Sequence, residues 1–133
     1  MKKSVIVVTF VWRDMKSMEK MAFDCGVSRL GRHPFAVCHP QSYSIENIKQ
    51  KNPTIIDVPM EDAHFASRDS YNDMMLKPDF YRQFQAYDFI LIYQLDAFIF
   101  RDELDTWVAQ DFDYIGAPWL PSDSWYQRTI GEA

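Results

Sequence analysis

The residue whose type and position most favour chemistry is Asp96. It follows an apolar run, Phe89 to Tyr93, which predicts a buried strand. In a parallel sheet, a carboxylate at the carboxyl end of a strand points into the crevice where ligands bind. There it can bind a metal ion or a sugar hydroxyl. A turn or helix-capping aspartate would occupy the same position, so Asp96 alone leaves both roles open.

Two classes of enzyme place an aspartate after a strand in this way. Haloacid-dehalogenase phosphatases use Asp-x-Asp-x-Thr, whose first carboxylate is the nucleophile. Here Asp96 is followed by Ala97-Phe98-Ile99-Phe100, so both the second Asp and the Thr are missing. Nucleotide-sugar glycosyltransferases of the type A fold instead carry an Asp-x-Asp at this position. Asp96 satisfies the first half of that element.

The elements that must position Asp96 alternate along the chain. Apolar and β-branched runs predict strands over residues 4–11, 34–38, 54–58, 88–95 and 114–115. Helical spacing predicts helices over 17–25, 44–51, 71–76 and 78–84, and another after Asp102. This order predicts an α/β fold of three layers, α/β/α, with a mostly parallel, Rossmann-like sheet. The length of 133 residues fits one domain.

The sequence also predicts local details of these elements. In the first helix, apolar spacing turns Met18, Met21, Ala22 and Cys25 inward behind a Ser17 cap, with Gly26 or Gly31 as the stop. Pro59 closes the third strand, and the run 88–95 forms a central buried strand. Leu104, Trp107 and Val108 face inward from the helix that Asp102 caps. Tyr114-Ile115 adds a last strand.

Composition excludes several classes of function. With 47% apolar residues the chain has enough hydrophobic surface to fold, and a net charge of −5 without a basic stripe argues against nucleic-acid binding. No run of 18 apolar residues predicts a membrane span, which leaves peripheral membrane contact open. Cys25 and Cys38 form no redox or zinc motif, so we expect reduced thiols in the cytoplasm.

A longer block, Tyr71 to Leu120, resembles the bacterial domain of unknown function 5672 family, which is thought to be glycosyltransferase-like. The resemblance is carried by several short pieces of the sequence in the same order: Tyr71-Asn72, Phe80-Tyr81, Ile90 to Asp96, Phe100 to Leu104, and Asp113 to Trp119. It implies the nucleotide-binding half of a type A glycosyltransferase fold. Residues 1–66 match only in general pattern.

The resemblance implies roles for particular residues. Asp96 corresponds to the first Asp of the Asp-x-Asp element and is the candidate catalytic and metal-binding residue. Thr9 and Phe10 stand where a base or ribose binds, and Gln94 can supply a neutral oxygen beside Asp96. The remaining candidates are Tyr71 and Asn72, which face the donor, and the arginines Arg13, Arg68 and Arg101, which can stabilise a leaving diphosphate.

The sequence also departs from the pattern. Phe98 replaces the second Asp, commonly the main metal ligand, which places the implied Mn²⁺ or Mg²⁺ in question. Asp73 stands where an Arg is expected after the Tyr-Asn pair. Relatives continue into a Gly-Asn-Gly-Gly segment and an acceptor half, so we expect the domain to be incomplete at its carboxyl end.

The resemblance implies a hexosyltransferase-like enzyme of cell-surface polysaccharide synthesis. Its partners would be a nucleoside-diphosphate-sugar donor and a saccharide acceptor. The alternative is a non-catalytic nucleotide- or sugar-binding module with a degenerate metal site, which Phe98 and Asp73 favour. A purely structural fragment that needs a missing half is the third possibility.

Overall fold

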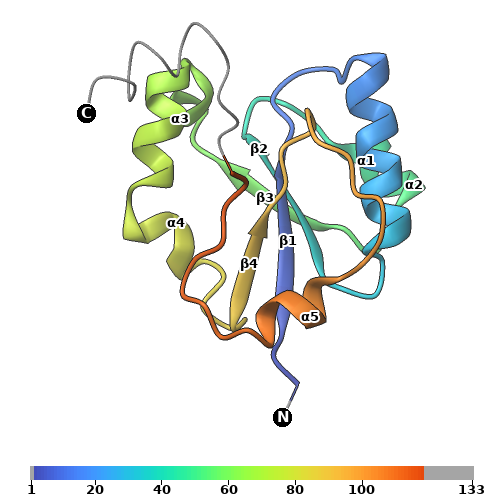
Figure 1. The fold of residues 1–133 in the computed structure, drawn as a ribbon. Helices are drawn as coiled ribbons and strands as arrows, with labels where there is room; N and C mark the ends of the chain where they lie inside the picture. Colours follow the sequence, from blue (N-terminus) through green and yellow to red (C-terminus); the bar gives the residue numbers. More distant parts are fainter. Residues whose placement is uncertain (1, 119–133) are drawn as a thin grey trace, which may run out of the picture.

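A four-stranded sheet lies between two layers of helices in the computed structural model, which describes residues 2–118 (Figure 1). All neighbouring strands run parallel, in the order β3-β2-β1-β4. This arrangement confirms the predicted α/β, Rossmann-like class. The strands are β1 (Val5–Phe10), β2 (Phe35–Pro40), β3 (Ile56–Met60) and β4 (Phe89–Ile92).

Helices cover both faces of the sheet. Helices α3 and α4 lie on one side of the sheet, and α1 and α2 lie on the other (Figure 1). Pro78 is the first residue of α4, where its missing N–H is not needed. The helical segments are α1 (Ser17–Arg29), α2 (Glu46–Lys51), the 3-10 helix η1 (Asp62–Phe65), α3 (Arg68–Met75), α4 (Pro78–Arg82) and α5 (Leu104–Val108).

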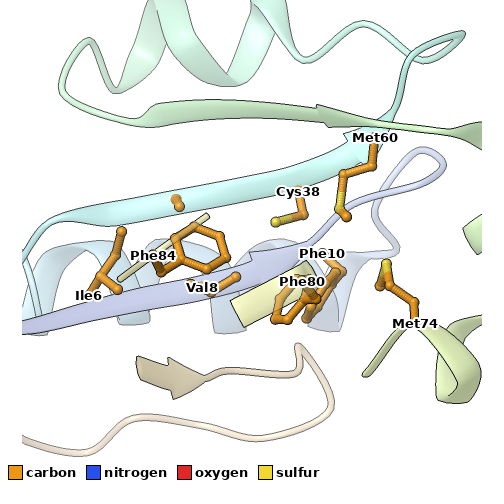
Figure 2. Close-up of a cluster of buried hydrophobic side chains, with 9 residues drawn as sticks. Ile6, Val8, Phe10, Cys38, Met60, Met74, Phe80 and Phe84 are labelled. Atoms are coloured by element: carbon orange, nitrogen blue, oxygen red, sulfur yellow. The ribbon is translucent and has the colours of Figure 1, made fainter. Parts of the chain in front are cut away.

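Strand β1 is one of the two inner strands that both helical layers cover. Its side chains alternate between the layers because successive residues of a strand point to opposite faces. Ile6, Val8 and Phe10 join the cluster under α3 and α4, where Phe80, Phe84 and Met74 meet them (Figure 2). Val7 and Val11 pack in the other cluster, toward α1. A continuous apolar run is therefore what this position requires.

The expectation that residues 88–95 form a central strand is wrong. Among the described strands, β4 lies at the end of the sheet and pairs only with β1. Its four residues are half-buried, whereas every residue of β1 is buried. Hydrophobicity alone did not distinguish an outer strand with two covered faces from an inner one.

The predicted inward face of α1 is right for Ala22 and wrong for the two methionines. Its buried residues are Ala22, Phe23 and Gly26, while the side chains of Met18 and Met21 are more than half exposed. Gly26 does not end the helix, which continues to Arg29. A Cβ atom at Gly26 would lie 2.6 Å from Cε1 of Tyr93, so this position sets how closely α1 approaches the end of β4.

Further differences concern the outer elements. Pro59 lies inside β3, opposite His39, because β3 is the outer strand at its end of the described sheet and tolerates a missing N–H. Ser17 is the first residue of α1 rather than its cap. The side chain of Trp107 on α5 is half exposed instead of buried. Tyr114-Ile115 forms no strand, and Tyr114 is exposed.

The described helices are short. The longest, α1, has 13 residues, and no helix within residues 2–118 combines the length and hydrophobicity of a membrane span.

Candidate functional site

The strand order places a crevice between the carboxyl ends of β1 and β4. From β1 the chain proceeds to β2 and β3 on one side, and then crosses back to β4 on the other side of β1. Ligands of open parallel sheets bind at such a reversal of strand order. A cavity of about 660 Å³ lies there, lined by residues that follow β1, follow β4, or begin α3. We call it the β1–β4 cavity; its volume suits a small-molecule ligand.

Most of the predicted donor-binding residues line the β1–β4 cavity. They come from segments far apart in the sequence and comprise Phe10, Arg13, Tyr71, Asn72, Gln94 and Asp96. Thr9 does not line it. The Thr9 side chain is fully buried, and its Oγ1 has no hydrogen-bond partner among the described residues. Its place in β1 between Val7 and Val11 turns it toward α1 instead.

Asp96 lies in a turn that a local hydrogen bond closes and that a contact with α1 holds in place. The N–H of Ala97 donates to the carbonyl of Gln94 at 3.1 Å and closes the turn. Just before it, the buried hydroxyl of Tyr93 donates to the carbonyl of Ala22 on α1 at 2.7 Å. Asp96 itself is exposed and forms no ion pair or side-chain hydrogen bond within residues 2–118. Its carboxylate is therefore available to a ligand.

Tyr71 connects α3 to the end of β4. Gln94 Nε2 donates to the Tyr71 hydroxyl at 3.2 Å, and the Tyr71 ring packs edge-to-face on Phe10 with centroids 5.2 Å apart. Burial is the main reason that the pKa of Tyr71 is raised, and the nearby charge of Asp96 acts in the same direction. The phenol therefore stays protonated at neutral pH. Because its oxygen already accepts from Gln94, its O–H remains free to donate to a ligand.

Arg13 lines the cavity but its charge is already paired. Its two terminal nitrogens donate to the two carboxylate oxygens of Glu19 at 2.9 and 2.8 Å. The pKa of Glu19 is lowered to about 2. The main cause is the hydrogen bond from Arg13, and the second is the hydrogen bond from the Lys16 N–H. The guanidinium also lies 5.3 Å from the centre of the Trp12 ring. At this part of the wall the ion pair is neutral overall.

Arg68 is the other cation in the lining of the cavity. It is the first residue of α3, after Ser67, whose hydroxyl accepts the N–H of Ser70 at 3.1 Å. Arg68 is exposed, and no carboxylate among the described residues lies within ion-pair distance of it. The third candidate arginine, Arg101, does not line this cavity and pairs with Glu103 at 2.8 Å.

Sequence reasoning missed part of the lining. Trp12, with its side chain 49% exposed, stands at the end of β1, and Glu19 reaches the cavity from the first turn of α1. The sequence did signal Trp12, which comes two residues after the last residue of β1. Glu19 had no such signal, because its place depends on how α1 folds back on the sheet.

The ends of β2 and β3 do not contribute to the β1–β4 cavity. His39 Nε2 lies 2.6 Å from the Asp57 carboxylate, and its Nδ1 lies 2.8 Å from the carbonyl of Pro40. Lys49 pairs with the same carboxylate at 3.2 Å. Burial acts to raise the pKa of Asp57, but the hydrogen bonds from His39 and Lys49 outweigh it and keep the pKa low. These side chains satisfy one another.

The residues around the cavity offer a divalent cation few ligands of their own. Magnesium and its analogues take oxygen ligands, usually from one or two carboxylates together with substrate phosphates. Asp96 is the one carboxylate available here, since Glu19 is bound by Arg13. Phe98 lies outside the cavity lining, in a shallow hollow with Arg101 and Glu103. Within residues 2–118, no three His, Cys, Asp or Glu side chains gather as a metal site would require.

Comparison with known proteins places the chain in a family. The profile of the family described as a protein of unknown function, DUF5672, matches residues 55–132, more than half of the sequence, so the chain belongs to this family. No curated protein and no solved structure matches the chain. The matched range contains the cavity residues from α3 and from the end of β4, but not those that follow β1. Of the sequence motif that ends the resemblance, Trp119 and Leu120 lie outside the described residues.

Proposed function

We propose that this DUF5672 protein is a glycosyltransferase domain that uses a nucleoside-diphosphate sugar as donor, in the synthesis of cell-surface polysaccharide. The observation that carries the proposal is that Asp96 is exposed, and without a partner among residues 2–118, in the wall of a cavity at the β1–β4 reversal. Open α/β sheets bind nucleotides at such a place. The cavity is large enough for one end of such a donor.

The polar lining suits recognition of hydroxyl groups. Asp96 offers acceptor oxygens, Tyr71 a free O–H, and Gln94 an amide that the same phenol orients at 3.2 Å. Asn72 adds a second amide from α3. A ribose or hexose presents several hydroxyls that both donate and accept, so this mixture of groups fits a sugar better than it fits an apolar ligand.

In the proposed reaction the bond between the anomeric carbon of the sugar and the diphosphate oxygen breaks. Its electron pair leaves with the nucleoside diphosphate, and an oxygen of the acceptor hydroxyl forms the new bond to the anomeric carbon. The hydroxyl proton is released to a base or to solvent. The protein must stabilise negative charge on the departing diphosphate and hold the sugar in place, and Asp96 serves the second task as a hydrogen-bond acceptor.

A non-catalytic nucleotide- or sugar-binding module is the second candidate. The observation that favours it is Phe98, which stands where the Asp-x-Asp element has its second carboxylate and lies outside the cavity lining. Such a module would use the same cavity without turnover. The two candidates therefore differ in reaction, not in the place of binding.

Calorimetry on the 133-residue chain with UDP- and GDP-sugars, each with Mn²⁺ and with EDTA, tests the proposal. We expect binding of at least one donor, and slow release of nucleoside diphosphate when water replaces the acceptor. Asp96→Ala should abolish that release. Asp24→Ala, which removes an exposed carboxylate from α1 away from the cavity, is the matched control and should leave it unchanged.

The possible outcomes separate the two candidates. Binding without release of diphosphate, in wild type and control alike, would support the module. If no donor binds under either condition, both candidates are wrong.

A further inference from the structure

We infer that Arg68 is the anchor for the diphosphate of the ligand, and that this anchoring needs no divalent cation. The inference rests on the proposed function, since it assigns the part of the cavity that binds the phosphates of a nucleotide donor. It goes beyond that function by replacing the metal expected at an Asp-x-Asp element with a single side chain.

The two cations in the cavity wall, Arg13 and Arg68, differ in whether their charge is paired. Arg13 donates to both oxygens of Glu19, at 2.8 and 2.9 Å, and the pKa of Glu19 is lowered to about 2. Glu19 therefore stays charged at any physiological pH and keeps Arg13 paired. Arg68 has no carboxylate partner among the described residues. Of the two guanidinium groups, Arg68 is the one with charge available to a ligand.

The carboxylate of Asp96 limits where an anion can lie within the cavity. Asp96 is an unpaired carboxylate, and without a cation between them it repels a diphosphate. The phosphates must therefore bind away from the end of β4, and the lining offers Arg68 at the start of α3. The sugar hydroxyls, which carry no charge, suit the wall formed by Asp96, Gln94 and Tyr71. Charge thus divides the cavity into a phosphate part and a hydroxyl part.

Hydrogen bonds to Ser67 fix the start of α3, where Arg68 lies. Ser67 is the residue before α3, and its hydroxyl accepts the N–H of Ser70 at 3.1 Å. Its carbonyl accepts the N–H of Tyr71 at 3.1 Å. Arg68 lies one helical turn before Tyr71, so the two side chains lie on the same side of α3. The inference rests on the guanidinium itself, since the side chain of Ser67 already occupies this end of the helix.

An arginine suits this task chemically. Its planar guanidinium presents parallel N–H donors that match two phosphate oxygens, and it remains charged at every physiological pH. As the bond to the sugar breaks, negative charge grows on the diphosphate, and a fixed positive charge beside it stabilises that change. A divalent cation would supply the same charge, but Asp96 would be its one available carboxylate ligand in the lining, so the phosphates and water would have to supply the others.

Calorimetry with UDP, GDP and inorganic pyrophosphate, each in EDTA and in Mn²⁺, tests the inference on the 133-residue chain. Wild type should bind at least one of the three diphosphates, and with equal affinity in both buffers. Arg68→Gln should weaken that binding about 10- to 100-fold, as expected when a charged hydrogen bond is lost. Arg68→Lys should recover part of the loss. Arg82→Gln, on an exposed arginine of α4 that pairs with Asp79, is the matched control and should bind like wild type.

The outcomes distinguish this inference from the proposed function. If a nucleoside diphosphate binds only with Mn²⁺, or if Arg68→Gln binds like Arg82→Gln, the inference is wrong and the proposed function stands. If pyrophosphate binds through Arg68 but no nucleotide binds more tightly than it does, the phosphate site stands and the proposed function is wrong. If none of the three diphosphates binds to wild type, both are wrong.

Discussion

Arg13, in the segment that joins β1 to α1, pairs with Glu19 in the first turn of α1, and each of its two terminal nitrogens donates to one carboxylate oxygen. One of those oxygens also accepts the N–H of Lys16 at 2.7 Å. The carboxylate thus satisfies a free N–H at the start of α1 and neutralises a cation in the wall of the β1–β4 cavity. One side chain links the stability of α1 to the charge of the cavity.

The first prediction is a pH-dependent contribution of Glu19 to stability. The lowered pKa of Glu19, about 2, means that the unfolded chain binds this proton at a higher pH than the folded chain does. The stabilisation is therefore complete above the ordinary glutamate pKa of about 4.3 and is lost as the pH falls toward 2. We expect Glu19→Gln to lower the free energy of unfolding by up to about 1 kcal/mol at pH 7.

Urea unfolding of wild type and Glu19→Gln at several pH values measures this contribution. The difference between the two should shrink to zero as the pH approaches 2. Glu46→Gln is the control, because Glu46 is exposed and lies 3.8 Å from Lys49 in a looser pair. A difference for Glu19→Gln that stays constant with pH would contradict the assigned role.

The second prediction concerns the contact between Gly26 and Tyr93. Helix propensity alone favours alanine over glycine by about 1 kcal/mol. Here a Cβ atom would lie 2.6 Å from the Tyr93 ring, which its hydroxyl ties to the carbonyl of Ala22. Moving a ring out of a packed core costs about 1 to 3 kcal/mol, so Gly26→Ala should destabilise the fold by about 1 kcal/mol net.

The matched control for Gly26→Ala is the same substitution in a Tyr93→Val background. Without the ring, the alanine should stabilise rather than destabilise, and chemical denaturation of the four variants gives the coupling energy. An unchanged effect of the alanine in both backgrounds would exclude the steric explanation.

These contacts show why the sequence predicted the strands better than the packing. A continuous apolar run such as Val5–Phe10 indicates a covered strand by itself. Asp96, which follows the apolar run of β4, likewise indicates a side chain at the crevice. The buried face of α1 depends on Tyr93, a residue 71 positions after Ala22. Apolar spacing selected Met18 and Met21 instead, since no local signal shows which neighbour will meet a helix.

The lining of the cavity could likewise be predicted only in part from the sequence. The sequence predicted the residues that follow the strands, because chain topology alone brings those ends together. Tyr71 and Asn72 on α3 were implied by the family resemblance instead. Whether a cation in the lining can bind a ligand depends on the ion pairs that the folded chain makes. Arg13 is not available to a ligand, because it pairs with Glu19. Thr9 shows the other failure, because adjacent strand residues face opposite sides and only one of Thr9 and Phe10 can reach the cavity.

The third prediction follows from the buried hydroxyl of Thr9. Its Oγ1 has no hydrogen-bond partner among the described residues, and the side chain is fully buried. Valine has the same shape without the hydroxyl, so Thr9→Val should raise the free energy of unfolding by about 1 kcal/mol. Thr9→Ala, which also leaves a void, should be less stable than Thr9→Val.

Ligand binding to the Thr9 variants distinguishes the buried position from the donor-binding role that the sequence predicted. We expect Thr9→Val to bind nucleotides with wild-type affinity in calorimetry. A loss of affinity without loss of stability would restore Thr9 to the site.

The last prediction assigns a role to Trp12. Its side chain is 49% exposed, it lines the β1–β4 cavity, and Arg13 lies 5.3 Å from the centre of its ring. An exposed indole at the edge of a nucleotide site can stack on a base, and loss of such a stack weakens binding by about 1 to 3 kcal/mol. Trp12→Ala should therefore weaken binding of UDP or GDP about 5- to 150-fold, while Trp12→Phe retains most of it.

Trp107→Ala is the matched control, because the Trp107 side chain is 51% exposed on α5 and does not line the cavity. Pyrophosphate, which has no base, should bind equally to wild type and Trp12→Ala, since the charge of Arg68 is untouched. Equal loss of affinity for pyrophosphate and for nucleotides would show that Trp12 supports the shape of the cavity rather than the base. Unchanged binding of every ligand would remove Trp12 from the site.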